Sequence, residues 1–388
     1  MKKKSNSRRM TYDVRRTPIV RPLWIEVDLR ALRANYRKIC KFVGSKVKII
    51  ATIKQSAYGH GLIPVAKCLS KAGVSFFGVG SVEEACQLRK AGFKQRIVVL
   101  TAVLNKFCDY FIKYEITPTV VDLAFARKLS SLAAKKKKKI SIHVKIDTGM
   151  GRLGKDVNDA HKFILSLSKL KNLRLEGLYT HFPVADTNFR FTNDQIKSFN
   201  EFIKNLEKEG VVFKYHHCAN SVGIMNYPHS HFNMIRPGLI LYGIESSTKA
   251  KLEVKPALSL KSRVIFIKRI KKGSGVSYGS AYVAKKPTYI ATIAAGYADG
   301  YPWAVSNNGK AGVIIGDKMY KVAGRVCMDH TMIDLGNKKI TPGQEVILLG
   351  SRGDLQITAN DLALWAKTIP YEVVSRFSLK IPRMYKGI

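Results

Sequence analysis

The sequence predicts an α/β fold in which an N-terminal (β/α)₈ barrel is followed by a smaller, mainly β domain. Two observations predict this fold class. Between residues 21 and 250, eight short apolar runs alternate with segments of helical periodicity, and after residue 250 the pattern changes to closely spaced β-type runs. A doubly wound open sheet is the alternative for the first part, because the number and order of the strands do not exclude it.

The eight runs are apolar on both faces, as parallel strands covered by helices are. The segments between them repeat apolar residues at spacings of three and four, which is typical of amphipathic helices, and residues 29–43 are one example. The predicted strands are 47–54, 74–80, 96–101, 117–122, 141–147, 173–181, 215–221 and 234–243.

Beyond the barrel, turn residues separate five further β-type runs, and Thr358 is placed to cap one helix near the end of the chain. These runs are 259–270, 288–297, 312–316, 321–336 and 344–350. The predicted organisation is therefore a basic tail over residues 1–20, the barrel over 21–250 and the β domain over 251–388.

The composition excludes several classes of protein. Hydrophobic residues make up 46% of the 388, so the chain buries a core instead of staying disordered. No apolar stretch approaches the roughly 18 residues of a membrane helix, and no apolar segment follows the basic start as in a secretory signal. The six cysteines form no C-x-x-C pair, and no metal-ligand spacing occurs. We therefore expect a cytoplasmic protein with reduced thiols and no bound metal.

The formal net charge of +40 raises the question of a polyanionic partner. Basic residues are densest in residues 2–21 and in the run Lys135–Lys139, and neither segment is interleaved with aromatic residues that could stack on bases. We therefore expect a solvated basic surface with neither a specific nucleic acid nor a membrane as partner. Such a surface would bind polyanions non-specifically at low salt.

Polar side chains gather at the predicted C-terminal ends of the barrel strands, where the active sites of such barrels lie. Lys54 stands between the first strand and a glycine-containing loop, and a partly buried lysine has a lowered pKa and can attack an aldehyde to form a Schiff base. Ser221 and Gly238 lie at the seventh and eighth strands, whose loops often bind phosphate. The group consists of Lys54, Lys145, Asp147, His181, Asn220, Ser221 and Arg236.

The segment KQSAYGHG (54–61) resembles the cofactor-lysine motif of the barrel-type alanine racemases, which use pyridoxal 5′-phosphate (PLP). Further segments of the chain, from about Arg21 to Tyr385, resemble other signatures of this family and occur in the same order. They are RPLWIEVDLRALRANY (21–36), HVKIDTGMGRLG (143–154), THF (180–182), ANS (219–221), IRPGLILYG (235–243), VSYGSAY (276–282), GYADGYP (296–302), GRVCMDHTMID (324–334) and IPYEV (369–373).

The resemblance implies a PLP-dependent racemase in which Lys54 holds the cofactor as a Schiff base. Arg236 would face the pyridine nitrogen, and because a guanidinium does not readily give up its proton, the ring would be a weak electron sink that disfavours side reactions. The residues implied in cofactor binding are Lys54, Tyr58, His181, Asn220, Ser221, Arg236, Gly238, Leu239 and Tyr371.

Racemisation removes a proton from one face of the α-carbon and delivers one to the other face. The family therefore uses two acid/base groups, which here would be Lys54 and Tyr278, with His181 beside the phenol. Arg152 and Met328 would bind the substrate carboxylate, and a carbamylated Lys145 would orient Arg152. The resemblance also implies a homodimer with shared active sites, which supplies D-alanine for peptidoglycan precursors.

Three departures from the family pattern lie near the implied site: Gln55-Ser56 after the cofactor lysine, Trp303 after GYP and His330 after CMD. They leave the preferred amino acid open, so racemisation of serine or of several amino acids, or PLP-dependent decarboxylation, are alternatives. A non-catalytic PLP- or polyanion-binding protein is a further alternative, against which the SYG motif argues. The carbamylation of Lys145, the strength of the dimer, the start of translation (at residue 1 or residue 10) and the role of the basic tail are also open.

Overall fold

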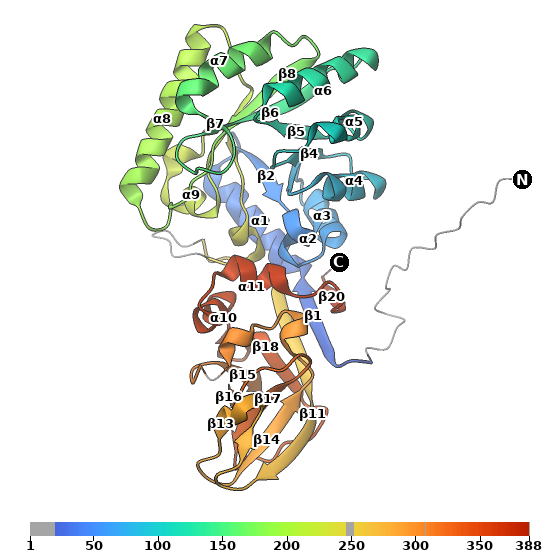
Figure 1. Ribbon diagram of the computed structural model, residues 1–388, viewed down its shortest axis with the longest axis vertical. Coiled ribbons are helices and arrows are strands. Elements are labelled where there is room, and N and C mark those ends of the chain that lie inside the picture. Colours follow the sequence, from blue (N-terminus) through green and yellow to red (C-terminus); the bar gives the residue numbers. More distant parts are fainter. Residues whose placement is uncertain (1–19, 246–251, 307, 388) are drawn as a thin grey trace, which may run out of the picture. The chain divides into compact units, whose positions relative to one another are not determined.

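The computed structural model describes residues 20–245, 252–306 and 308–387, so the predicted basic tail lies almost entirely outside the described residues. The chain divides into two compact units (Figure 1). The first, here called the barrel unit, comprises residues 29–257 and Gly387, and the second, the β unit, comprises residues 20–28 and 258–386. None of the described helices is long and apolar enough to cross a membrane.

The barrel unit is built on eight parallel strands in the order β10-β2-β3-β4-β5-β6-β8-β9. The two ends of this order are linked by the backbone N–H of Arg236, which donates to the carbonyl of Ala219 at 3.0 Å. The sheet is therefore a nearly closed barrel, which confirms the predicted fold and excludes the open sheet. The strands are β2 (Lys48–Thr52), β3 (Phe76–Val79), β4 (Arg96–Val99), β5 (Thr117–Val120), β6 (Ile140–Asp147), β8 (Leu173–Tyr179), β9 (Tyr215–His217) and β10 (Met234–Ile235), with β7 (Lys155–Asp156) paired to β6.

Helices alternate with the barrel strands along the chain (Figure 1), and the residues that they bury are mainly apolar. In α8, the residues Ile196, Phe199, Ile203 and Leu206 are buried at spacings of three and four. Several helices begin at a side chain that accepts a backbone N–H bond, as Asp122 does for α6. The helices are α1 (Leu29–Val43), α3 (Leu62–Lys71), α4 (Val82–Lys90), α5 (Cys108–Lys113), α6 (Leu123–Lys135), α7 (Val157–Ser168), α8 (Phe189–Lys208) and α9 (Ser221–Asn226).

The β unit contains a nine-stranded sheet in the order β19-β18-β15-β16-β17-β14-β11-β1-β20. An additional pairing of β18 with β11 closes six of these strands into a ring. The strands are β1 (Leu23–Asp28), β11 (Leu258–Ile270), β14 (Thr288–Ile293), β15 (Gly312–Ile315), β16 (Lys318–Val322), β17 (Thr331–Gly336), β18 (Glu345–Arg352), β19 (Leu355–Ile357) and β20 (Arg383–Lys386), with a separate hairpin of β12 (Gly275–Val276) and β13 (Tyr282–Val283).

Two helices, α10 (Ala359–Ala366) and α11 (Pro370–Arg376), follow the last hairpin of the β unit. The predicted cap is present, because the Thr358 hydroxyl accepts the Asp361 N–H while the Asp361 carboxylate accepts the Thr358 N–H. The sequence analysis did not predict α11, which begins with a proline at its first position.

Two predictions from the sequence differ from the structure: the unit to which residues 21–28 belong, and the number of strands in residues 321–336. Residues 21–28 were predicted to belong to the barrel, whereas β1 pairs antiparallel with β11 and parallel with β20, both of which belong to the β unit. The predicted single run 321–336 is two strands, since the chain leaves the sheet after Val322 and passes through Gly324 at φ +80°, a conformation that favours glycine. The loop between these strands carries Met328.

Candidate active site

Lys54 lies two residues after the first barrel strand, β2, and begins an unusual turn, α2 (Lys54–Tyr58). The four residues after the lysine, Gln55 to Tyr58, have φ between 52° and 55°, so they form a left-handed turn. Residues with a side chain enter this conformation at a cost of about 1–2 kcal/mol each. Glu84 of α4 compensates part of this cost: its Oε1 accepts the Ser56 N–H at 2.8 Å and its Oε2 accepts the Gly80 N–H at 2.9 Å.

The half-buried ammonium of Lys54 lies in an environment that disfavours its charge. Burial lowers its pKa, the Arg152 and Arg236 cations lower it further, and only Glu84 opposes them. A lowered pKa increases the fraction of neutral amine, which is the nucleophilic form of lysine. Gly80 leaves space here, because a Cβ on it would stand 3.2 Å from Lys54 Cβ.

A second group of polar atoms lies where the chain leaves β9 and β10. The Ser221 hydroxyl accepts the backbone N–H groups of Gly238 at 3.0 Å and of Ile240 at 3.4 Å. A Cβ on Gly238 would stand 2.9 Å from the Tyr58 hydroxyl and 3.6 Å from Ser221 Oγ. Asn220 caps α9 by accepting the Gly223 N–H at 2.9 Å, and Leu239 begins the short helix η3 (Leu239–Tyr242). The sequence predicts a phosphate site at these residues, and we name the group formed by Tyr58, Ser221 and Gly238 the phosphate cradle after that prediction.

Arg236 is buried and its guanidinium is held on several sides. Nη1 donates to His217 Nδ1 at 2.6 Å and to the His217 carbonyl at 2.7 Å. Nη2 donates to the Thr180 carbonyl at 2.7 Å, to the Cys218 carbonyl at 3.0 Å and to His181 Nδ1 at 3.3 Å. The pKa of His181 is well below its usual value because the imidazole is buried and then because Arg236 and other cations lie near it, so His181 is neutral.

Lys145 on β6 is 2% exposed, and its Nζ donates to the Leu153 carbonyl at 2.6 Å. Burial and the nearby Arg152 cation lower its pKa to about 8. The neighbouring Asp147 shapes the loop that carries Arg152, because its carboxylate accepts the N–H groups of Gly149, Met150 and Gly151. The barrel unit therefore brings all of its predicted site residues to the C-terminal ends of its strands.

The remaining predicted residues lie in the β unit. Tyr278, in the short helix η4 (Tyr278–Ser280), is 70% exposed, and Met328 is 54% exposed. Their loops adjoin, since the Ser277 hydroxyl donates to the Arg325 carbonyl at 2.7 Å. Tyr371 is the second residue of α11.

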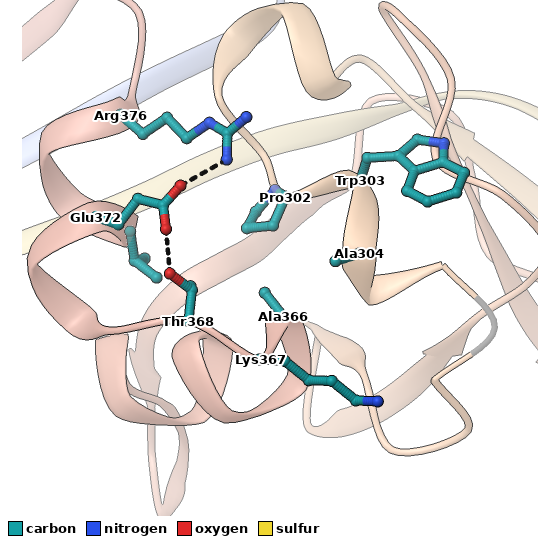
Figure 2. A pocket seen from close by; sticks show the side chains of 9 residues that line it. Pro302, Trp303, Ala304, Ala366, Lys367, Thr368, Glu372 and Arg376 are labelled. Atoms are coloured by element: carbon teal, nitrogen blue, oxygen red, sulfur yellow. Dashed lines mark hydrogen bonds and ion pairs between the residues drawn. The ribbon is translucent and has the colours of Figure 1, made fainter.

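A pocket of about 320 Å³ lies next to α11 (Figure 2). Glu372 lines it, accepts the Thr368 hydroxyl and pairs with Arg376 at 2.8 Å. None of the predicted cofactor or substrate residues lines this pocket, although Trp303, one of the departures from the family pattern, does.

Two residues that organise the site, Glu84 and His217, were not predicted from the sequence. Glu84 sits in the first turn of an ordinary helix, so no local pattern marks its role. His217 is a buried histidine that ends β9 and lies inside the predicted strand 215–221, three residues before the predicted site residue Asn220, and this closeness in sequence could have marked it.

Comparison with known proteins agrees with this geometry. The family described as "Alanine racemase, N-terminal domain" matches residues 27–246, and "Alanine racemase, C-terminal domain" matches residues 257–385. The chain is 39% identical to the alanine racemase of Halothermothrix orenii, over 95% of this chain and 98% of that protein, and 40% identical to that of Carboxydothermus hydrogenoformans, over 94% and 100%.

Solved structures are similar over nearly the whole chain. The alanine racemase of Clostridium difficile 630 superposes with a TM-score of 0.87 at 36% identity, covering 94% of this chain and 96% of that one. The alanine racemase of Bacillus anthracis with bound L-Ala-P gives 0.89 at 33% identity, covering 96% of each chain. The two matched domains, these identities and this coverage together show that the chain belongs to the alanine racemase family.

Proposed function

We propose that this protein is a PLP-dependent alanine racemase that interconverts L-alanine and D-alanine, with Lys54 and Tyr278 as its two acid/base groups. The observation that carries this proposal is Lys54, whose pKa is lowered by burial and neighbouring cations at the same end of the barrel as the phosphate cradle. A lysine that is partly neutral can both bind an aldehyde and accept a proton.

The residues of the barrel unit fit PLP. Gly238 has no Cβ, and one there would fill the space beside the Tyr58 and Ser221 hydroxyls. A phenol, a hydroxyl and backbone N–H groups at the starts of α9 and η3 form a suitable donor set for a phosphate, to which Leu239 and Asn220 would add. Tyr371 of the β unit is proposed as a further phosphate ligand on the family resemblance alone. When bound, PLP withdraws electrons from the substrate and makes its α-proton acidic.

Arg236 controls the polar groups behind the reacting atoms. A guanidinium only donates, so His181 Nδ1 must accept from it, and the neutral His181 ring therefore carries its proton on Nε2. In the proposed shared site this Nε2–H would donate to the Tyr278 oxygen and would stabilise the phenolate that accepts the α-proton. Arg236 would also donate to the pyridine nitrogen without transferring its proton.

Lys145 and Arg152 would position the substrate. Two cations side by side repel, but a neutral Lys145 amine can attack CO₂, so that an N–C bond forms, a proton leaves and a carbamate anion results. The pKa of about 8 supports this step because it leaves neutral amine near physiological pH. The carbamate would attract and orient Arg152, which with the backbone N–H of Met328 would hold the substrate carboxylate.

The exposed apolar residues of the β unit support a homodimer with shared sites. Tyr278, Tyr297 and Met328 are all large and substantially exposed. Their loops adjoin, since the Ser277 hydroxyl donates to the Arg325 carbonyl and the Tyr297 N–H to the Cys327 carbonyl. Exposed apolar side chains that gather in this way mark interfaces, and Trp303 is a further large, exposed side chain of this unit. We propose that this surface meets the barrel of a second copy, that the enzyme acts in the cytoplasm, and that its D-alanine enters peptidoglycan precursors.

The test is enantiomer exchange followed by chiral chromatography, with purified protein, added PLP and either alanine or serine. We expect alanine to be racemised, and borohydride reduction to fix the cofactor on Lys54. Lys54→Ala should abolish exchange, whereas the exposed Lys106→Ala should not. Full activity in Lys54→Ala would overturn the assignment, and faster exchange of serine than of alanine would overturn the substrate.

A further inference from the structure

A line of polar side chains continues from Arg236 into the interior of the barrel. His217 Nε2 lies 2.9 Å from His143 Nδ1, and His143 Nε2 lies 3.9 Å from Glu176 Oε2. The other carboxylate oxygen of Glu176 forms an ion pair with Arg96, the first residue of β4. His143, His217 and Glu176 are at most 2% exposed, so this line runs through the barrel core.

The strands are shaped to hold this line. In the pairing of β6 with β8, Ile142 faces Leu175 and His143 faces Gly177, so Glu176 is an extra residue on β8, a β-bulge. Bulges turn a side chain out of its regular alternation, and here the bulged residue carries the buried carboxylate. The next residue must be glycine, because a Cβ on Gly177 would stand 2.6 Å from His143 Nδ1.

The direction of the hydrogen bonds determines where each imidazole carries its proton. Arg236 only donates, so His217 Nδ1 accepts and the His217 proton lies on Nε2. That proton is donated to His143 Nδ1, so the His143 proton lies on Nε2 and faces Glu176. Burial, followed by the Arg236 cation, lowers the pKa of His143 to about 3 and that of His217 well below its usual value, so both rings are neutral.

The end of the line is held by charge and not by a hydrogen bond. Among the described residues, neither His143 Nε2 nor Glu176 Oε2 has a hydrogen-bond partner. A carboxylate 3.9 Å from an N–H attracts it strongly in a buried site, and the reversed tautomer would turn a lone pair toward the anion.

We propose that Glu176 and His143 are positioning residues for Arg236: the buried carboxylate holds both imidazoles in the Nε2–H form, so that His217 always offers a lone pair to the guanidinium. This inference rests on the proposed function only in that Arg236 faces the cofactor. The effect on catalysis would pass through Arg236 to His181, which the same guanidinium orients.

The first test is nitrogen-15 NMR of the ring nitrogens in the cofactor-free wild-type protein, whose nine histidines are assigned by single substitutions. We expect His143, His181 and His217 as Nε2–H tautomers. A proton on Nδ1 of either His143 or His217 would overturn the proposal. Because this measurement uses the wild-type protein, it does not depend on whether a Glu176 variant folds.

The second test is Glu176→Gln. Its carbonyl would stay with Arg96, so its NH₂ group would face His143 Nε2 and reverse the tautomers. We expect altered ring-nitrogen signals for His143 and His217 and a fall in kcat of about tenfold with a much smaller change in KM. Glu176→Asp keeps the carboxylate and should retain the wild-type tautomers, as should the exposed control Glu201→Gln on α8.

Unchanged histidine tautomers in Glu176→Gln would contradict the proposal. Reversed tautomers in Glu176→Asp as well would also contradict it, because they would show that side-chain packing, and not the carboxylate charge, determines the tautomers. Failure of the proposed function is distinguishable, because a wild-type protein without racemase activity would still report its histidine tautomers.

Discussion

Gly238 determines how much space the phosphate cradle offers. The distance of 2.9 Å from its absent Cβ to the Tyr58 hydroxyl is shorter than a van der Waals contact allows. The cradle therefore depends on a missing side chain as much as on the hydroxyl and phenol that line it. Neither neighbour can withdraw without cost, since Tyr58 belongs to the left-handed turn and Ser221 is held by two N–H groups.

Gly238→Ala should weaken PLP binding by about tenfold, or about 1.4 kcal/mol, measured by equilibrium dialysis of the cofactor. If the loss comes from overlap with the phenol, Tyr58→Phe introduced into Gly238→Ala should restore part of the affinity. If the losses of PLP binding free energy in Gly238→Ala and Tyr58→Phe simply add in the double variant, overlap with the phenol is not the cause.

The proposed carbamylation of Lys145 would make the site depend on pH and CO₂. Its pKa of about 8 means that the neutral amine becomes more abundant as pH rises through 8 and less abundant as pH falls below it. Because carbamate formation uses the neutral amine and releases a proton, occupancy should rise with pH at a fixed CO₂ pressure. Carbon-13 NMR with labelled CO₂ at pH 6 to 9 measures this, with Lys145→Ala as the control. A carbamate signal that does not change with pH would be inconsistent with this mechanism.

The left-handed turn after β2 is the element whose geometry matters most for the site. Four consecutive residues with side chains hold positive φ values, and a single carboxylate, Glu84, satisfies N–H groups from both this turn and the end of β3. Glu84 thus couples the first βα connection of the barrel to the second. Strain of this kind persists only where the surroundings hold it in place.

Glu84→Gln should destabilise the turn by about 1–3 kcal/mol, because an amide NH₂ would face a backbone N–H. Hydrogen exchange at Ser56 and Gly80 should accelerate, and PLP affinity should fall. Glu83→Gln is a matched control in the same first turn of α4, so any effect on the helix dipole is common to both. Equal exchange rates in the two variants would show that Glu84 does not hold the turn.

The barrel strands could be predicted from sequence because helices cover both faces of a parallel strand, which makes each strand a short apolar run bounded by polar residues. The site positions at the strand ends followed from the same pattern. The assignment of β1 failed because pairing partners far along the chain, β11 and β20, decide which unit a strand joins. The left-handed turn and the line from Arg236 to Glu176 were not predictable, since both depend on contacts between different strands and helices.

Considered as a whole, the barrel unit distributes its charge unevenly. The helix-to-strand connections, at the N-terminal ends of the strands, contain nineteen lysines and arginines and only three acidic residues. All of these basic residues except Arg89 are exposed. The segments are 41–48, 69–76, 89–96, 113–117, 135–140, 166–174 and 207–215. The face opposite the candidate site is therefore the strongly basic one.

This face should carry much of the non-specific binding to polyanions. Heparin chromatography in a salt gradient measures it, with glutamine replacing all five lysines of the run Lys135–Lys139. We expect this variant to elute at clearly lower salt than a control with the same charge change in the β unit. The control carries Lys268→Gln, Lys271→Gln, Lys272→Gln, Lys285→Gln and Lys286→Gln, all at exposed positions. Identical elution would mean that overall charge alone determines binding.

The position of β1 between β11 and β20 has a consequence for biosynthesis. The ribosome makes residues 23–28 long before their antiparallel neighbour, which begins at residue 258, and their parallel neighbour, which begins at residue 383. At about 5–20 residues per second, the nascent strand waits for tens of seconds with both edges unpaired. The barrel can be finished during this interval, whereas the sheet of the second unit cannot be completed until residues 383–386 have been made.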